Sequence, residues 1–226
     1  MSTVLLSTSY LGPIQYYSKL LSADAVILER FEHFPKQTYR NRCVIYSANG
    51  PQALSIPVSK SKENKIYTKD IRIDYSMNWQ KIHFKAIESA YRCSPFYQYY
   101  IDDIIPFYEK QYQFLYDLNL IILSKTLQTI GLQCNIAETE KYINILPSDY
   151  LDYREFIHPK KRMYIPDNSF QPPVYQQVFE PKHEFIANLS IIDLLFNTGP
   201  ETLTLLKQSN SIKEVRPPNM SGLNEP

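Results

Sequence analysis

The sequence has few cysteines, and it spaces them too widely for a domain built on disulfides or zinc. Among 226 residues there are three, Cys43, Cys93 and Cys134, with no CxxC pair. An odd number of scattered cysteines argues against a disulfide framework and against a zinc site. The longest apolar stretches, Leu120 to Leu123 and Ile191 to Phe196, fall well short of the roughly 20 residues that a membrane span needs. Because no signal peptide is recognisable either, we expect a cytoplasmic protein without a membrane span.

The sequence also lacks an excess of charge of one sign and lacks the standard catalytic motifs. Its 24 basic and 23 acidic side chains give a net charge of +1, which produces no strong field for nucleic acid. Nucleic-acid binding through the basic run Lys160-Lys161-Arg162 is a further alternative, which the balanced charge disfavours. The GxSxG, HExxH, P-loop and GxGxxG patterns are all absent. We therefore expect no metal, no cofactor and no nucleic-acid partner.

What the sequence has in quantity is tyrosine, with 19 tyrosines beside 11 phenylalanines and one tryptophan. Tyrosine combines a flat apolar body with a polar hydroxyl, so it suits pockets that bind hydroxylated ligands. The alternative, a core and surface rich in tyrosine, is the commoner explanation for any individual tyrosine.

The first thirty residues predict a Rossmann-like βα unit. Thr3 to Ser9 predicts a short buried strand, Ile14 to Ala23 has the apolar spacing of a helix, and Ala25 to Leu28 predicts a second strand. Pro13 suits the start of the helix because it has no N–H to leave unpaired. A strand, a helix and a strand in so short a segment predict a right-handed crossover between parallel strands.

Residues 41–75 add antiparallel strands, so that residues 1–75 are expected to form a mixed sheet. Asn49-Gly50 is a strong hairpin turn, and Cys43 to Tyr46 and Ala53 to Val58 flank it as strands. Ile71 to Tyr75 alternates between apolar and polar residues as a half-exposed strand does. The fold class that follows is α/β, with a mainly helical C-terminal half in one domain of residues 1–208.

The remaining regions of that domain are a helical region at 76–131, a proline-rich segment at 158–183 and C-terminal helices at 188–208. Apolar spacing predicts helices from Trp79 to Ala90, from Phe96 to Ile105 and from Phe114 to Ile130, the last ended by Gly131. Residues 158–183 hold five of the 16 prolines and several aromatics, which favours an ordered loop or lid. Ser190 to Asp193 resembles a capping box that opens a helix. Residues 209–226 are expected to be a flexible tail.

Two places in the first third are candidate anion sites. The turn from Ser7 to Tyr10 follows a strand and precedes a helix, and a helix N-terminus offers free N–H groups. The alternative is that its hydroxyls merely cap that helix. Arg40 and Arg42 come just before a predicted strand, where alternation directs both guanidiniums to one face and lets them hold a phosphate. The alternative there is a surface ion-pair cluster with nearby acidic residues.

His83 is the best single candidate for acid–base chemistry, because its ordinary pKa is near neutrality. It lies on the apolar stripe of its predicted helix, so the alternative is a hydrogen-bonded core histidine. Lys81 points to another side of that helix, and Trp79 precedes both.

Several of these segments together resemble the WbqC-like protein family. They are Leu5 to Tyr17, with an aromatic pair at Tyr16-Tyr17, Glu32 to Arg42, which ends in Asn41-Arg42, Leu54 to Val58, Trp79 to His83, Ser94 to Tyr97 and Asn188 to Gly199. The chain departs from the commoner family pattern at Thr8-Ser9, where many members have Gln-Pro, and at Gly12, which replaces a proline.

The resemblance implies work in bacterial surface-polysaccharide biosynthesis of the O-antigen type. The expected activity is an acyl- or aminoacyl-type transferase that modifies a nucleotide-activated amino sugar, with a nucleotide sugar as the ligand. The expected base is His83, and the expected substrate-binding residues are Ser9, Tyr10, Tyr17, Tyr39, Arg40, Asn41, Arg42, Trp79, Lys81 and Asn188. The alternative is a non-catalytic binding or scaffold protein, in which Asp193, Asn197 and the proline-rich loop would form a partner surface.

Overall fold

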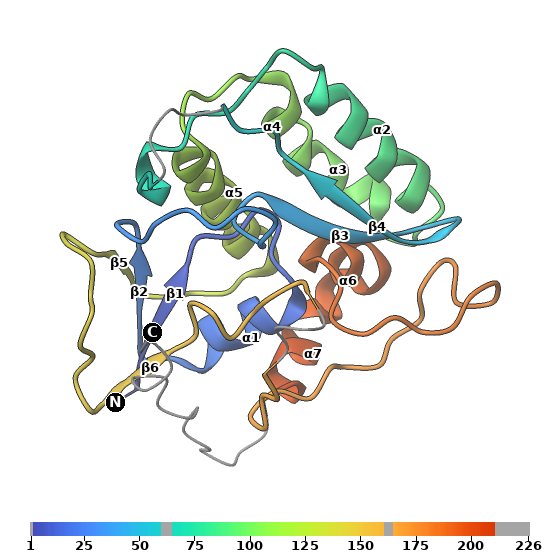
Figure 1. Cartoon of the computed structure of the whole chain (residues 1–226). Helices are drawn as coiled ribbons and strands as arrows, with labels where there is room; N and C mark the ends of the chain where they lie inside the picture. The colour runs from blue at the N-terminus through green and yellow to red at the C-terminus, as the bar shows by residue number, and fades with distance from the viewer. Residues whose placement is uncertain (1, 60–64, 161–164, 211–226) are drawn as a thin grey trace.

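A computed structural model describes residues 2–59, 65–160 and 165–210 (Figure 1). It contains a four-stranded sheet in the order β5-β2-β1-β6, and every neighbouring pair in this sheet is parallel. One continuous hydrophobic core joins this sheet to the helices and to a separate hairpin. The α/β class predicted from the sequence is confirmed.

The predicted βα unit forms as expected. It consists of β1 (Thr3–Ser7), α1 (Ile14–Ser22) and β2 (Ala25–Glu29), and Thr3 pairs in parallel with Ala25. Val4 to Ser7 are all buried, which is typical of a parallel strand covered on both faces. Figure 1 shows α1 beside this sheet, at its junction with the C-terminal helices.

Two short strands that the sequence did not predict complete the sheet. They are β5 (Ile136–Glu138), which pairs with β2, and β6 (Tyr150–Asp152), which pairs with β1. Three residues are too few to establish an alternating pattern, so periodicity could not reveal them. Because all four strands are parallel, their carboxyl ends lie at the same edge of the sheet.

The antiparallel strands make a sheet of their own rather than extending the first one. β3 (Arg42–Ser47) and β4 (Gly50–Ser55) form the hairpin predicted around Asn49-Gly50, and Gly50 has a φ of +94°. Only glycine adopts such a φ without steric cost. Ile71 to Tyr75 makes isolated bridges, with Ile73 opposite Val58, instead of a continuous strand.

The helical region is close to its prediction and packs over the hairpin (Figure 1). Its elements are η1 (Thr68–Asp70), α2 (Trp79–Tyr91), α3 (Tyr97–Ile104), α4 (Pro106–Glu109) and α5 (Leu115–Ile130). Gly131 ends α5 in the left-handed conformation, as predicted. No helix among the residues that the structure describes is long and apolar enough to cross a membrane.

The C-terminal helices are α6 (Ile191–Thr198) and α7 (Thr202–Gln208), joined by η3 (Gly199–Glu201). The predicted capping box is wrong. The Ser190 side chain caps no N–H of α6, because its hydroxyl instead donates to the Leu11 carbonyl at 2.7 Å. The helix is therefore tied to the loop that precedes α1.

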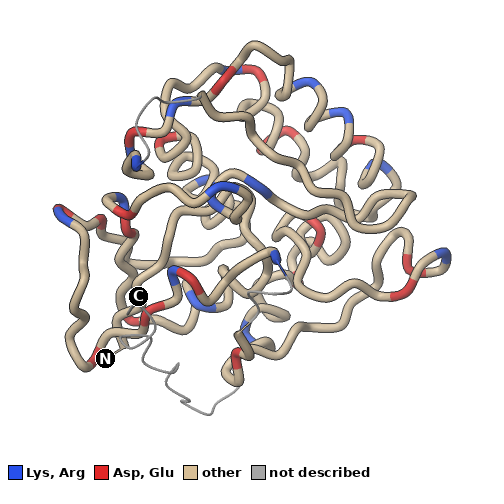
Figure 2. The backbone as a smooth tube through the Cα atoms, in the orientation of Figure 1, with Lys and Arg blue, Asp and Glu red and all other residues tan. Residues whose placement is uncertain are grey.

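Two buried polar clusters hold the described part of the proline-rich segment against the helices. Near its start, Lys19 on α1 pairs with Asp167 at 2.7 Å. Further on, the Tyr175 hydroxyl donates to Asp193 of α6 at 2.6 Å. Positions 161 and 162 of the basic run lie outside the described residues, as does most of the predicted tail, at 211–226. Along the described backbone, Lys and Arg are interspersed with Asp and Glu (Figure 2).

Candidate functional site

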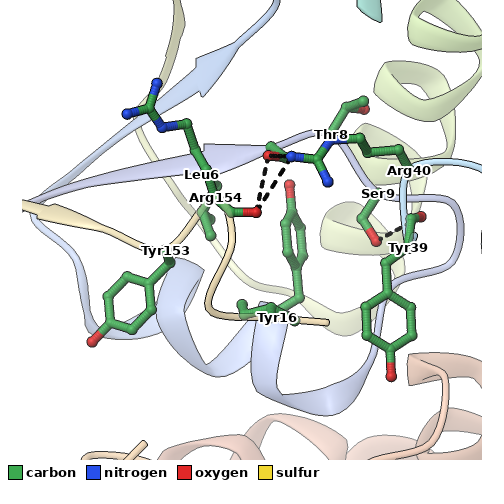
Figure 3. Close-up of a pocket in the computed structure, with 10 residues that line it drawn as sticks. Leu6, Thr8, Ser9, Tyr16, Tyr39, Arg40, Tyr153 and Arg154 are labelled. Carbon is green, nitrogen blue, oxygen red and sulfur yellow. Dashed lines mark hydrogen bonds between the residues drawn. The ribbon is translucent and has the colours of Figure 1, made fainter. Parts of the chain in front are cut away.

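A small polar pocket lies at the carboxyl edge of β1 and β6 (Figure 3). Its lining residues come from the end of β1, from α1, from the turn before β3 and from the segment after β6: Leu6, Ser7, Thr8, Ser9, Tyr16, Tyr39, Arg40, Tyr153, Arg154 and Ile157. Open α/β sheets place their ligands at this edge. The space open to the centre of a water molecule is about 10 Å³, which is close to the minimum for one ordered water. A larger ligand therefore has to displace side chains.

The guanidinium of Arg40 is bound by carboxylates within the protein. Its Nε donates to Glu32 Oε1 at 2.7 Å, and its Nη2 donates to Glu32 Oε2 at 2.6 Å. The same Nη2 donates to Glu155 at 2.9 Å. Burial opposes the charged form, but the two carboxylates outweigh it and raise the pKa of Arg40. One positive group and two negative groups leave a net charge of −1, so Arg40 has little attraction left for a phosphate.

The prediction that Arg40 and Arg42 share one strand face is wrong. β3 begins at Arg42, and Arg40 lies in the preceding turn, where strand alternation does not apply. The Arg42 Nε donates across the hairpin to Ser55 Oγ at 2.8 Å, and Arg42 does not line the pocket. The two guanidiniums therefore cannot hold one phosphate as a pair.

The Tyr16 hydroxyl is the strongest sign of a ligand in this pocket. Tyr16 is 3% exposed, and its hydroxyl has no hydrogen-bond partner among the described residues. Figure 3 shows it pointing into the pocket, toward Arg40. A buried hydroxyl without a partner costs about 1–3 kcal/mol. Burial raises the pKa of Tyr16 well above its usual value, so the group stays protonated and can donate a hydrogen bond.

Ser9, Tyr39 and Arg40 are the predicted residues that meet in the pocket. The Ser9 hydroxyl donates to the Tyr39 carbonyl at 3.4 Å, and burial raises the pKa of Tyr39 to about 12. Gly12 makes this arrangement possible, because a Cβ at that position would lie 2.7 Å from Ser9 Oγ.

His83, Tyr10 and Trp79 form a buried group that does not line the pocket. The Tyr10 hydroxyl bonds His83 Nδ1 at 3.0 Å and the Tyr108 hydroxyl at 2.7 Å. The Trp79 ring packs edge-on against His83, with centroids 5.2 Å apart. Burial lowers the pKa of His83 to about 4, so the imidazole is neutral at neutral pH. Trp79, expected to bind substrate together with Arg40 and Arg42, therefore does not line the pocket that Arg40 lines.

The predicted anion site at the N-terminus of α1 is also wrong, because protein groups already bind its N–H groups. Ile14 N donates to the Leu189 carbonyl at 3.0 Å, and Gln15 N donates to Asn188 Oδ1 at 2.9 Å. Asn188 adopts a positive φ of 57° to do so. Its carboxamide thus acts as a cap for α1 from far along the chain.

The other predicted binding residues lie elsewhere. Tyr17 is a core residue of α1, and Asn41 donates from Nδ2 to the Ile56 carbonyl at 2.9 Å. Lys81 is on the exposed face of α2. Neither these nor Asn188 lines the pocket, so any role they have in binding stays a prediction.

Sequence reasoning missed Tyr16 and the segment from Tyr153 to Ile157. The Arg154 side chain points out of the pocket, as Figure 3 shows, and pairs with Asp152 at 2.7 Å. Its carbonyl faces Arg40 instead, accepting from Nη2 at 3.4 Å. The Tyr16-Tyr17 pair of the family pattern could have indicated this site. Both side chains are buried, however, and only the Tyr16 hydroxyl lacks a partner.

Comparison with known proteins supports one assignment. The sequence profile of the WbqC-like protein family matches residues 8–149 and 140–205. The chain belongs to the WbqC-like family. Uncharacterized protein Rv1507c of Mycobacterium tuberculosis is 24% identical over 225 residues, covering 90% of this chain and 96% of the relative. No solved structure matches this WbqC-like chain. Within the described residues, no three His, Cys, Asp or Glu side chains gather as metal ligands.

Proposed function

We propose that this WbqC-like protein is a cytoplasmic bacterial transferase that modifies the sugar of a nucleotide-activated amino sugar. The pocket at the carboxyl edge of β1 and β6 would hold the sugar. The observation that carries the proposal is the buried Tyr16 hydroxyl, which is directed into this pocket without a protein partner. A sugar hydroxyl would satisfy it.

The lining has the chemistry of a sugar site. The lining includes the hydroxyl residues Ser7, Thr8 and Ser9 and the aromatic residues Tyr16, Tyr39 and Tyr153. Aromatic faces and a few convergent polar groups are how proteins orient small hydroxylated ligands. The net charge of −1 around Arg40 favours an amine on that sugar over a free phosphate.

The absence of a nucleophile motif is compatible with this reaction class. When an activated acyl donor transfers its acyl group, the amine nitrogen of the substrate attacks the acyl carbon, and the donor's leaving group departs with the electron pair of the broken bond. The nitrogen loses a proton to an acceptor, so the protein contributes orientation and that proton acceptor. His83 as that acceptor stays a prediction, since it is buried, bonds the Tyr10 hydroxyl and does not line the pocket.

Thermal unfolding with a panel of nucleotide sugars tests the proposal. A nucleotide-activated amino sugar that binds the folded state should raise the Tm, because ligand binding stabilises by mass action. Tyr16→Phe should lose most of that rise. Tyr116→Phe is the matched control, because its hydroxyl is also buried without a hydrogen-bond partner among the described residues, whereas Tyr116, on α5, does not line the pocket. If no nucleotide sugar in the panel raises the Tm of the native chain, the proposal is rejected.

A second candidate function, a non-catalytic binding protein, is favoured by one specific observation. None of the histidines and cysteines, all of which fall within the described residues, lines the pocket. The partner surface expected around Asp193 is not available, since this residue is 0% exposed and bonded to Tyr91 and Tyr175. Mass spectrometry of the sugar after incubation with acyl donors separates the two functions, because a binding protein would leave its mass unchanged.

A further inference from the structure

After β2, residues 32–34 pair with residues 66–68 at the carboxyl edge of the sheet. This short pairing has an inner and an outer side. Phe34 N donates to the Ile66 carbonyl at 2.9 Å, and Thr68 N donates to the Glu32 carbonyl at 2.9 Å. His33 and Tyr67 are direct antiparallel partners in this pairing. Because side chains alternate along extended chains, neighbouring residues face opposite sides.

The inner side of this pairing carries Glu32, which is 6% exposed and holds Arg40 in the pocket wall. The outer side carries three aromatic rings, Phe31, His33 and Tyr67. The His33 and Tyr67 rings are stacked, with centroids 5.2 Å apart and planes 7° apart. Phe31 meets Tyr67 edge-on at 5.9 Å. Tyr67 is 43% exposed and His33 is exposed as well, so the stack is open to an incoming ring.

Lysines flank these rings. Lys69 Nζ lies 5.4 Å from the centroid of Phe31, although it also pairs with Asp70 at 2.9 Å. Lys65 is exposed two residues before Tyr67, and alternation places it on the same side. Stacked aromatics beside lysines are the arrangement that binds a base together with its phosphate.

The pocket cannot supply the cation that a nucleotide diphosphate requires, because Glu32 and Glu155 already compensate Arg40. The geometry points to the outer side of this pairing as the nucleotide subsite of the ligand: the nucleobase stacks on His33 and Tyr67, and Lys65 and Lys69 bind the diphosphate. This inference rests on the proposed function, because it assumes that the sugar arrives attached to a nucleotide. Glu32 links the two places, since it pairs with Arg40 of the pocket lining while its neighbours Phe31 and His33 carry two of the outer rings.

Isothermal titration calorimetry with free nucleoside diphosphates (UDP, dTDP, CDP, GDP and ADP) tests this subsite directly. At least one should bind, and Tyr67→Leu, which keeps the backbone pairing and removes the ring, should weaken it on the order of tenfold. Lys65→Ala should weaken the same diphosphate and make its affinity less dependent on salt. Tyr99→Leu is the matched control, because Tyr99 is 77% exposed on α3. Circular dichroism confirms that each variant is folded.

The outcomes separate this inference from the proposed function. Diphosphate affinity that is unchanged in Tyr67→Leu and Lys65→Ala overturns the nucleotide subsite, as does absence of any diphosphate binding. If the nucleotide sugar still raises the Tm in a manner dependent on Tyr16, the proposed function survives that failure. Binding of a diphosphate through Tyr67, without any added effect of the sugar or of Tyr16→Phe, supports the subsite and rejects the sugar pocket.

Discussion

Glu32 and Arg40 form a buried bidentate ion pair, with N–O distances of 2.6 and 2.7 Å, beside the pocket at the carboxyl edge of the sheet. Their side chains are 8% and 3% exposed. The pair fixes the turn before β3 to the segment after β2, so it positions the pocket wall. It also explains why the arginine that the sequence singles out is a structural cation here rather than a free anion site.

Removing one partner of this pair should destabilise the protein strongly. We expect Glu32→Gln to lower the free energy of unfolding by about 3–5 kcal/mol, because it leaves a buried guanidinium partly uncompensated. Urea unfolding followed by circular dichroism measures the change. Glu138→Gln is the control, since its pair with Arg30 is 36–38% exposed and should contribute less than about 1 kcal/mol. Equal effects of the two substitutions would contradict the structural role of Glu32.

Removing the Tyr16 hydroxyl should not lower the free energy of unfolding, whereas removing a buried hydroxyl that has hydrogen-bond partners should lower it. Without ligand, we expect Tyr16→Phe to be as stable as the native chain or slightly more stable, because an unpartnered polar group is removed. Tyr10→Phe should lose about 1–3 kcal/mol, since that hydroxyl bonds both His83 and Tyr108. Urea unfolding of both variants provides the comparison. A marked loss of stability in Tyr16→Phe would mean that its hydroxyl has a protein partner.

His83 should make the protein less stable in mild acid. Burial lowers its pKa in the folded state to about 4, whereas the unfolded value is about 6.5. Between these values the unfolded chain binds the extra proton, so stability is complete above pH 6.5 and falls as the pH drops toward 4. The loss from this group should be about 2 kcal/mol at pH 5 relative to pH 7.

Chemical unfolding of the native chain and of His83→Gln at pH 7 and pH 5 isolates this contribution. The variant should show a smaller loss of stability between the two pH values than the native chain. An identical pH dependence in His83→Gln would show that the imidazole titrates normally.

The contact between Tyr175 and Asp193 should hold the proline-rich segment in place. Tyr175→Phe removes a 2.6 Å hydrogen bond to a buried carboxylate, for which we expect a loss of about 1.5–3 kcal/mol. Amide hydrogen exchange should become faster between residues 170 and 188, ahead of the rest of the chain. Tyr142→Phe, with a side chain that is 48% exposed, provides the control. If amide hydrogen exchange in this segment is unchanged, other contacts hold the segment in place.

The sequence predicts those parts of the fold that have a strong local signal. The βα unit, the Asn49-Gly50 hairpin and the helix ended by Gly131 all form, because each combines a clear apolar period with a turn or cap residue. β5 and β6 carry no such signal, since their position in the sheet depends on contacts with distant strands.

The site was harder to predict because burial and partners decide what a polar side chain can do. Asn188 reads as a ligand-binding residue, yet its oxygen caps α1 through Gln15 N. Arg40 lines the pocket, but its charge is compensated by Glu32, which lies eight residues earlier in the chain. The apolar spacing of this helix does not indicate that the Tyr16 hydroxyl lacks a partner, whereas Tyr17 is a core residue.

The order of strand pairing in the four-stranded sheet has a consequence for folding during translation. Thr3 pairs with Ala25 on one side and with Tyr150 on the other. One edge of β1 therefore stays open until β6 has been translated, and such long-range pairing slows folding. An unpaired apolar edge exposed for that long is a substrate for chaperones and a starting point for aggregation, so yields of this protein should respond to growth temperature and to chaperone supply.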